Sequence, residues 1–166
     1  LGTLILVFIV THMVNFWARM HFDEKMPLQT IMINTGQGVA PQEFYLTTDG
    51  GYMPKAQIDQ KSIVIKDRTQ FFDAEAGVKL KEGYKDLHKI TFEFFQDPTY
   101  GLVATILYVI AMAVLGFHLN HGFASAFQSL GVNNKFTPAI KSFGKLFSII
   151  VPVLFAIIPI YIHFVK

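Results

Sequence analysis

Three histidines lie inside long apolar runs of this 166-residue sequence. His12 stands in "FIVTHMVNFW", and His118 and His121 stand in "LGFHLNHGF". An ionisable side chain within a membrane segment is costly, and by default it indicates a function. The imidazole could bind a metal or a haem iron, relay protons, or hydrogen-bond a neighbouring helix. The rest of the sequence has to separate these three kinds of chemistry.

Composition separates them only in part. The apolar runs contain no Asp or Glu, although intramembrane proton relays are commonly built with carboxylates. A zinc site would need about four converging ligands, and the chain has no Cys to provide one. A haem iron needs only axial imidazoles, which helices can supply. Haem ligation and a simple interhelical hydrogen bond therefore both stay open for each histidine.

The elements that must position these histidines are three apolar stretches, each long enough for a bilayer span of about 20 residues. The chain is 52% hydrophobic and 16% charged, which leaves too little polar sequence to cover three core helices in a soluble protein. We therefore expect an all-α membrane protein, a transmembrane helix bundle with one long extramembranous loop. The expected order is a transmembrane helix at 1–20, an extramembranous loop at 21–99, a transmembrane helix at 100–130, a loop at 131–145 and a transmembrane helix at 146–166.

The region 21–99 holds all 12 acidic residues of the chain. Its apolar content is thin, so we expect a cap and not an independent domain. "MPLQT" and "TDGGYMPK" are turn chemistry, and "KSIVIKD" alternates as a short strand does. Residues 84–95 have apolar side chains at helical spacing, which predicts an amphipathic helix lying at the membrane interface.

Charge predicts the orientation. The loop 131–145 carries Lys135, Lys141 and Lys145 and no acid, so the positive-inside rule places it in the cytoplasm and the region 21–99 outside. The chain's net charge of +2 comes without a basic stripe, which argues against a nucleic-acid partner.

Depth then separates two of the histidines. His12 should lie about 15 Å from the outer end of its helix, and His118 about 27 Å from the outer end of its own. A difference of roughly 12 Å prevents one iron from binding both imidazoles. Two irons at two depths could do so, each with its second ligand on another helix. His163, near the end of the third span, is expected to make an interfacial hydrogen bond.

Residues 117–131, "FHLNHGFASAFQSLG", resemble the fourth helix of the cytochrome b membrane anchor of succinate dehydrogenase and fumarate reductase, in its five-helix, di-haem form. Residues 8–17 resemble the third helix of that family. The resemblance covers all three spans but not the region 21–99, whose length is most like the Bacteroidetes branch. It implies that the three spans are the last three of five helices, in a bacterial inner membrane, with 21–99 in the periplasm.

The resemblance implies that His12 and His118 are axial ligands of an outer and an inner haem b, with partner ligands on the missing N-terminal helices of the same protein. It further implies a non-catalytic electron-transfer subunit of succinate:quinone oxidoreductase, respiratory complex II. The chain would pass electrons between an iron–sulfur subunit and a membrane quinone, expected to be menaquinone. Dicarboxylate chemistry would take place on a flavoprotein subunit.

Two further residues are weaker candidates for contacts with haem propionates. Arg19 could serve there, or its guanidinium could simply snorkel to the interface. His121 could also serve there, or contact a neighbouring helix. Some family members carry an acid near the fourth-helix ligand, whereas Gly116 precedes His118 by two residues here. The resemblance therefore gives no support for that proton pathway.

Two other functions stay open. The chain could be the di-haem anchor of another respiratory dehydrogenase, such as a hydrogenase or formate dehydrogenase. It could also be a haem-free transporter or scaffold whose histidines sit at helix contacts. A reduced-minus-oxidised spectrum would separate the cytochromes from the haem-free protein.

Overall fold

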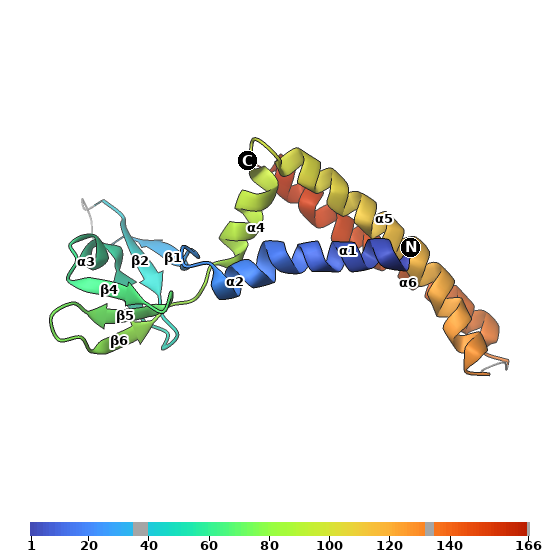
Figure 1. Cartoon of the computed structure of the whole chain (residues 1–166), viewed down its shortest axis with the longest axis horizontal. Coiled ribbons are helices and arrows are strands. Elements are labelled where there is room, and N and C mark those ends of the chain that lie inside the picture. Colours follow the sequence, from blue (N-terminus) through green and yellow to red (C-terminus); the bar gives the residue numbers. More distant parts are fainter. Residues whose placement is uncertain (35–39, 132–134, 166) are drawn as a thin grey trace. The chain divides into compact units, whose positions relative to one another are not determined.

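The computed structural model describes residues 1–34, 40–131 and 135–165. The chain divides into two compact units (Figure 1). We call the first, Leu1–Asn15 with Thr91–Lys166, the helical unit, and the second, Phe16–Ile90, the polar unit.

Within the residues that the structure describes, three helices are long and apolar enough to cross a membrane, as the sequence predicts. They indicate a membrane protein. The first is a continuous helical run over Gly2–Phe22, and the others occupy the second and third apolar stretches. The run Gly2–Phe22 consists of α1 (Gly2–His12), a π-helix η1 (Met13–Ala18) and α2 (Arg19–Phe22). The two long helices are α5 (Gly101–Ser129) and α6 (Thr137–Phe164).

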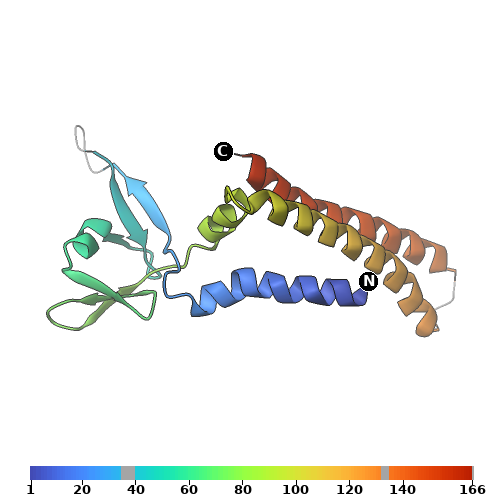
Figure 2. The ribbon, with the colours of Figure 1, turned by 45° about the horizontal axis from the view of Figure 1, so that its top comes forward.

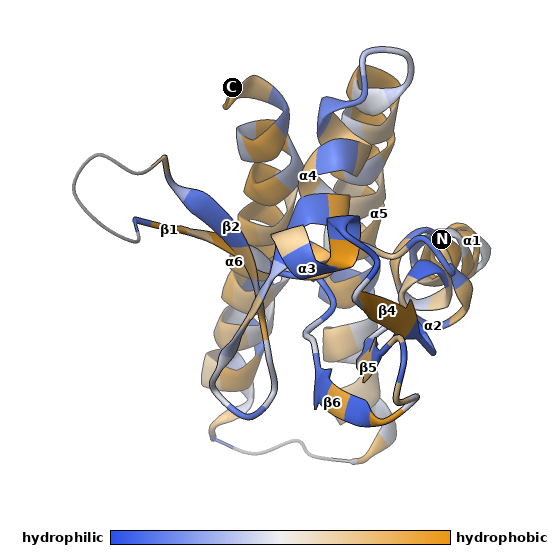
Figure 3. Cartoon of the chain, turned by 90° about the vertical axis from the view of Figure 1, so that its left-hand side faces the viewer, coloured by the Kyte–Doolittle hydropathy of each residue, from blue (hydrophilic) through white to orange (hydrophobic). Residues whose placement is uncertain are grey.

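Helices α5 and α6 lie side by side and antiparallel (Figure 2). Small residues let them approach. A Cβ on Gly116 would lie 3.0 Å from the carbonyl oxygen of Ser148, and a Cβ on Gly144 would lie 2.1 Å from the Phe123 ring. Close approach at small residues is the usual way in which membrane helices pack, because lipid removes the hydrophobic drive between them. Orange, hydrophobic residues predominate along both helices in Figure 3, and most of their large apolar side chains are exposed.

A short turn at residues 97–100, which we call the elbow, leads into α5. Helix α4 (Leu87–Gln96) precedes it and is amphipathic, as the spacing predicts. Asp97 Oδ1 accepts hydrogen bonds from the backbone N–H groups of Thr99 and Tyr100, at 2.8 and 3.1 Å. Gly101 follows, and any Cβ there would lie 2.5 Å from the Phe95 carbonyl oxygen. Only glycine fits this approach, so the elbow fixes where α5 begins.

The expectation of an all-α protein is wrong for the polar unit, which contains two small antiparallel sheets. One has the strand order β1-β2-β3 and the other β4-β5-β6. A short helix, α3 (Lys55–Asp59), connects them. The strands are β1 (Thr30–Ile33), β2 (Gln42–Leu46), β3 (Tyr52–Pro54), β4 (Ile63–Lys66), β5 (Gln70–Asp73) and β6 (Lys79–Glu82).

A small apolar core joins the two sheets. Leu28, Met53, Ile63 and Phe71 are buried together, with Tyr45 and Ile58 packed against them. The polar unit therefore has a small core of its own, although its apolar content is thin, because its few apolar residues are concentrated at inward positions. The predicted strand in "KSIVIKD" is confirmed as β4, and the turn in "TDGGYMPK" is confirmed between β2 and β3.

Helix α6 begins at Thr137, earlier than the predicted span at Leu146. Proline stands in its first turn, where the missing N–H costs no hydrogen bond. Lys141 and Lys145 consequently lie on the helix and not in the loop predicted at 131–145. The two inner prolines, Pro152 and Pro159, are accommodated without ending the helix.

Candidate functional site

His12 is the last residue of α1, where this helix meets α5. Its Nδ1 lies 3.3 Å from the hydroxyl of Tyr108 on α5. The two ring centroids are 5.9 Å apart, and the Phe8 ring lies 5.7 Å from the imidazole on its own helix. Despite these contacts, His12 is exposed within the part of the chain that the structure describes. The structure therefore brings His12 into polar contact with a second helix.

Tyr108 is a residue that sequence reasoning missed. Its ring packs edge-on against Phe8 and Phe95, at centroid distances of 5.2 and 5.0 Å. The Asn15 side chain also hydrogen-bonds the Tyr108 hydroxyl. The available signal was a phenol in the middle of an apolar helix, since a buried tyrosine hydroxyl usually finds a polar partner. Tyr108 thus ties two polar side chains of the first span to α5.

The helix changes its winding directly after His12. Met13–Ala18 form a π-helix, whose hydrogen bonds span one residue more than those of an α-helix and which is rare and frequently found at functional sites. Asn15 lies inside this segment. The wider turn alters the direction of every side chain that follows it, so the angular positions expected from a regular helix do not apply beyond His12.

His118 and His121 lie on α5, and both side chains are exposed. His118 follows Tyr108 by ten residues, which is about 15 Å along the helix and about 80° around it. Because Tyr108 contacts His12, this rise measures the separation of the two imidazoles along the α5 axis. It agrees with the roughly 12 Å estimated from charge and helix rise. The structure does not bring His12 and His118 together.

Gly116 has a structural reason to be glycine. A Cβ on Gly116 would lie 3.0 Å from the Ser148 carbonyl oxygen and 3.6 Å from the Pro152 ring. A carboxylate side chain at this position would meet the backbone of α6. The position two residues before His118 therefore serves helix packing.

The remaining sequence candidates have protein partners. Arg19 Nε lies 3.6 Å from Asp23 Oδ2, in a half-exposed pair one turn apart. His163 Nδ1 donates to the Phe95 carbonyl oxygen at 2.7 Å, so the hydrogen bond predicted for His163 is confirmed.

Charged side chains of the polar unit pair with one another. Lys55 lies 2.5 Å from Glu43 and holds the pKa of that carboxyl below its ordinary value. The Thr47 hydroxyl, the Gly51 N–H and the Lys81 ammonium lower the pKa of Asp49 to about 2. Because Asp49 lies in the β2–β3 turn and Lys81 in β6, their 3.1 Å pair connects the two sheets. These contacts are structural.

Across residues 1–34, 40–131 and 135–165, no three His, Cys, Asp or Glu side chains gather as they would around a bound metal ion. The imidazoles of His12 and His118 instead lie on two different apolar helices, and both residues are exposed. This donor set fits axial ligation of a porphyrin iron, to which one helix contributes one imidazole. It also leaves His121 as an exposed side chain three residues beyond His118.

Comparison with protein-family models, with curated proteins and with solved structures finds no match to this chain.

Proposed function

We propose that this chain is part of a di-haem cytochrome b that anchors a succinate:quinone oxidoreductase in a bacterial inner membrane. One observation carries the proposal. His12 and His118 are exposed on two apolar helices, and the helix rise from Tyr108, which contacts His12, to His118 is about 15 Å. An ionisable side chain within a membrane segment indicates a function by default. Two haems b at two depths would use both imidazoles as axial ligands.

The chain's own residues have defined tasks in this proposal. His12 would hold an iron through Nε2, and its Nδ1–H would then donate to the Tyr108 hydroxyl. Such an outer hydrogen bond fixes the ring and raises the basicity of the ligand. His118 would hold the other iron, and the second imidazole for each iron would come from further helices of the same protein. When bound, the haems supply one-electron transfer at potentials set by their ligands and burial.

The resemblance of residues 117–131 to the fourth helix of the complex II anchor favours particular partners. A flavoprotein subunit exchanges electrons with succinate or fumarate, an iron–sulfur subunit carries them, and menaquinone is the membrane substrate. The end of the helix pair at which α6 begins would then face the cytoplasm, in agreement with Lys135 before α6 and with Lys141 and Lys145 near its start. Purified complex that reduces a menaquinone analogue with succinate supports these partners. Activity with hydrogen or formate instead would assign the chain to another dehydrogenase.

The haem ligands can be tested directly. We expect the purified protein to show a b-type reduced-minus-oxidised spectrum with two haems per chain. His12→Ala and His118→Ala should each remove one haem and spare the other, as judged by haem content and redox titration. His121→Ala, on the same helix as His118, is the matched control and should retain both.

A haem-free scaffold is the second candidate, because the His12–Tyr108 contact is what a histidine gluing two helices would make. It predicts no b-type absorption and a protein destabilised by His12→Ala without any spectral change. That result would overturn the cytochrome proposal. Loss of haem from the His121→Ala control alone would overturn only the ligand assignment.

A further inference from the structure

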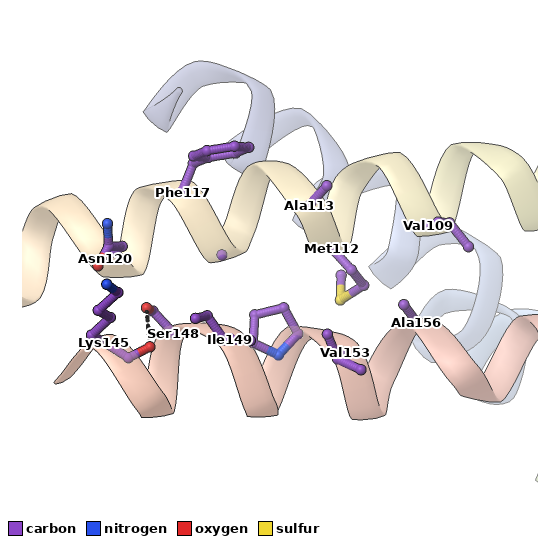
Figure 4. Close-up of a pocket in the computed structure, with 12 residues that line it drawn as sticks. Val109, Met112, Ala113, Phe117, Asn120, Lys145, Ser148, Ile149, Val153 and Ala156 are labelled. Atoms are coloured by element: carbon purple, nitrogen blue, oxygen red, sulfur yellow. Dashed lines mark hydrogen bonds between the residues drawn. The ribbon is translucent and has the colours of Figure 1, made fainter. Parts of the chain in front are cut away.

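The two long helices leave a groove between them on the half of α5 that follows Val109. Its volume is about 460 Å³. Met112 and Phe117 of α5 and Ile149 and Val153 of α6 contribute apolar walls (Figure 4). Gly116 holds the helices close together here, with the Ser148 carbonyl and the Pro152 ring against it. The groove is therefore a feature of the α5–α6 packing and lies within one unit of the molecule.

One end of the groove is polar. Asn120 and Lys145 line this end (Figure 4). Lys141 lies one turn before Lys145 on α6, so the two ammonium groups share a face. The sequence contains no Asp or Glu after Asp97, so neither long helix, nor the loop between them, can supply a carboxylate to these lysines. An anion that neutralises them has to come from another molecule or another segment.

The length of the groove fits one leaflet. From Lys145 to Ala156, the last lining residue on α6, the helix rises about 16 Å. This is close to half of the roughly 30 Å hydrocarbon core of a bilayer. The polar end lies toward the start of α6 and the apolar end toward the membrane interior. An amphipathic molecule with an anionic head and an alkyl chain has this same order.

We propose that the groove binds an anionic phospholipid. One acyl chain lies between α5 and α6, and the phosphate rests on Lys145 and Lys141. Basic pockets between membrane helices bind anionic head groups in this way, each lysine near the surface contributing about fivefold in affinity. The site is separate from the imidazoles of His12 and His118 and does not depend on haem.

Titration of the intact, delipidated protein by native mass spectrometry tests the proposal. The two probes are phosphatidylglycerol and phosphatidylcholine with identical acyl chains. We expect one tightly held phosphatidylglycerol and only weak, non-saturating binding of phosphatidylcholine. Lys141→Gln combined with Lys145→Gln should weaken phosphatidylglycerol about 25-fold. Lys135→Gln is the matched control, because Lys135 precedes α6 and its ammonium lies over the Phe136 ring, whereas Lys141 lies one turn from the groove residue Lys145. This control should change nothing.

A second variant tests the acyl chain. Ala113 lines the groove and is exposed, so Ala113→Phe should fill it and abolish the tight site while both lysines remain. Equal binding of the two lipids would overturn the proposal, as would phosphatidylglycerol binding that survives both variants. Displacement of the bound lipid by a neutral menaquinone would also overturn it, since that outcome assigns the groove to the quinone. Helix content measured by circular dichroism shows that each variant is folded.

Discussion

The two units of this chain bury opposite kinds of residue. In the polar unit most buried positions are large and apolar, and Phe71 is 0% exposed, although Thr47 and Gly83 are also buried. In the helical unit many buried positions are small or proline, including Gly144, Ser148, Pro152 and Pro159 of α6, while most large apolar side chains face outward. Water drives large side chains inward, whereas a lipid surface leaves packing to close backbone contact. Each unit is thus organised for a different solvent.

The strongest test of this comparison removes the central ring of the polar unit. Phe71→Ala should cost about 3–5 kcal/mol, the usual effect of emptying a buried aromatic position. Hydrogen exchange of the intact protein should show loss of protection in β4, β5 and β6 with the long helices unchanged. Phe155→Ala is the matched control, because Phe155 is 56% exposed on α6. Equal loss of protection in both variants would contradict the contrast between the units.

The converse change adds volume to the helical unit. Gly116→Val should cost about 1–3 kcal/mol through overpacking against the α6 backbone. Gly122→Val is the control, since a Cβ at Gly122 meets no atom within 4 Å. Thermal unfolding in detergent should show a lower stability for Gly116→Val and an unchanged stability for Gly122→Val. If Gly122→Val is destabilised as much, the helix propensity of the backbone and not close packing explains both effects.

A smaller effect is expected from Tyr108→Phe, which keeps the aromatic packing and removes the hydroxyl. The lost hydrogen bond should cost about 1 kcal/mol. Under the haem proposal it also lowers the basicity of the His12 imidazole, which raises the reduction potential of one haem and leaves the other unchanged. Redox titration measures both potentials. Tyr161→Phe, an exposed tyrosine of α6, should move neither, and a shift of both haems in Tyr108→Phe would contradict the assigned contact.

The smallest expected effect concerns acid stability of the polar unit. The folded pKa of Asp49, about 2, lies below its ordinary value of 3.8. Its contacts therefore stabilise the folded state fully above about pH 3.8, and this contribution is lost as the pH falls toward 2. The Thr47 hydroxyl is the largest cause, so Thr47→Val should raise the pKa of Asp49 in a carboxyl NMR titration. Thr48→Val, at the exposed neighbour, should leave the pKa of Asp49 unchanged.

The sequence predicted the helical unit better than the polar unit. Apolar runs of about 20 residues are typical of membrane spans, so all three spans could be located. Helix α4 could be predicted from the helical spacing of its apolar residues. The strands of the polar unit have only three to five residues, too few for alternation to stand out. The turn between β4 and β5 adopts positive φ at Asp67 and Arg68, where glycine or asparagine would have signalled a hairpin.

The candidate site shows the same limit. His12 and His118 could be singled out because an imidazole is conspicuous in an apolar run. Tyr108 could not, because its position opposite His12 depends on how two helices cross. The π-helix after His12 leaves no periodic signature within six residues. The early start of α6 was hidden by Lys141 and Lys145, whose charges interrupt the apolar run without interrupting the helix.

The two prolines inside α6 have a mechanical consequence. Pro152 and Pro159 are two turns apart, so they fall on one line of the helix, and both are buried. Each lacks the N–H that would bond the carbonyl four residues earlier, at Ser148 and at Phe155. Helix α6 should therefore bend most easily in the plane that contains this line of prolines and resist bending in the perpendicular direction. Slow bending motions of α6 are expected in that single plane.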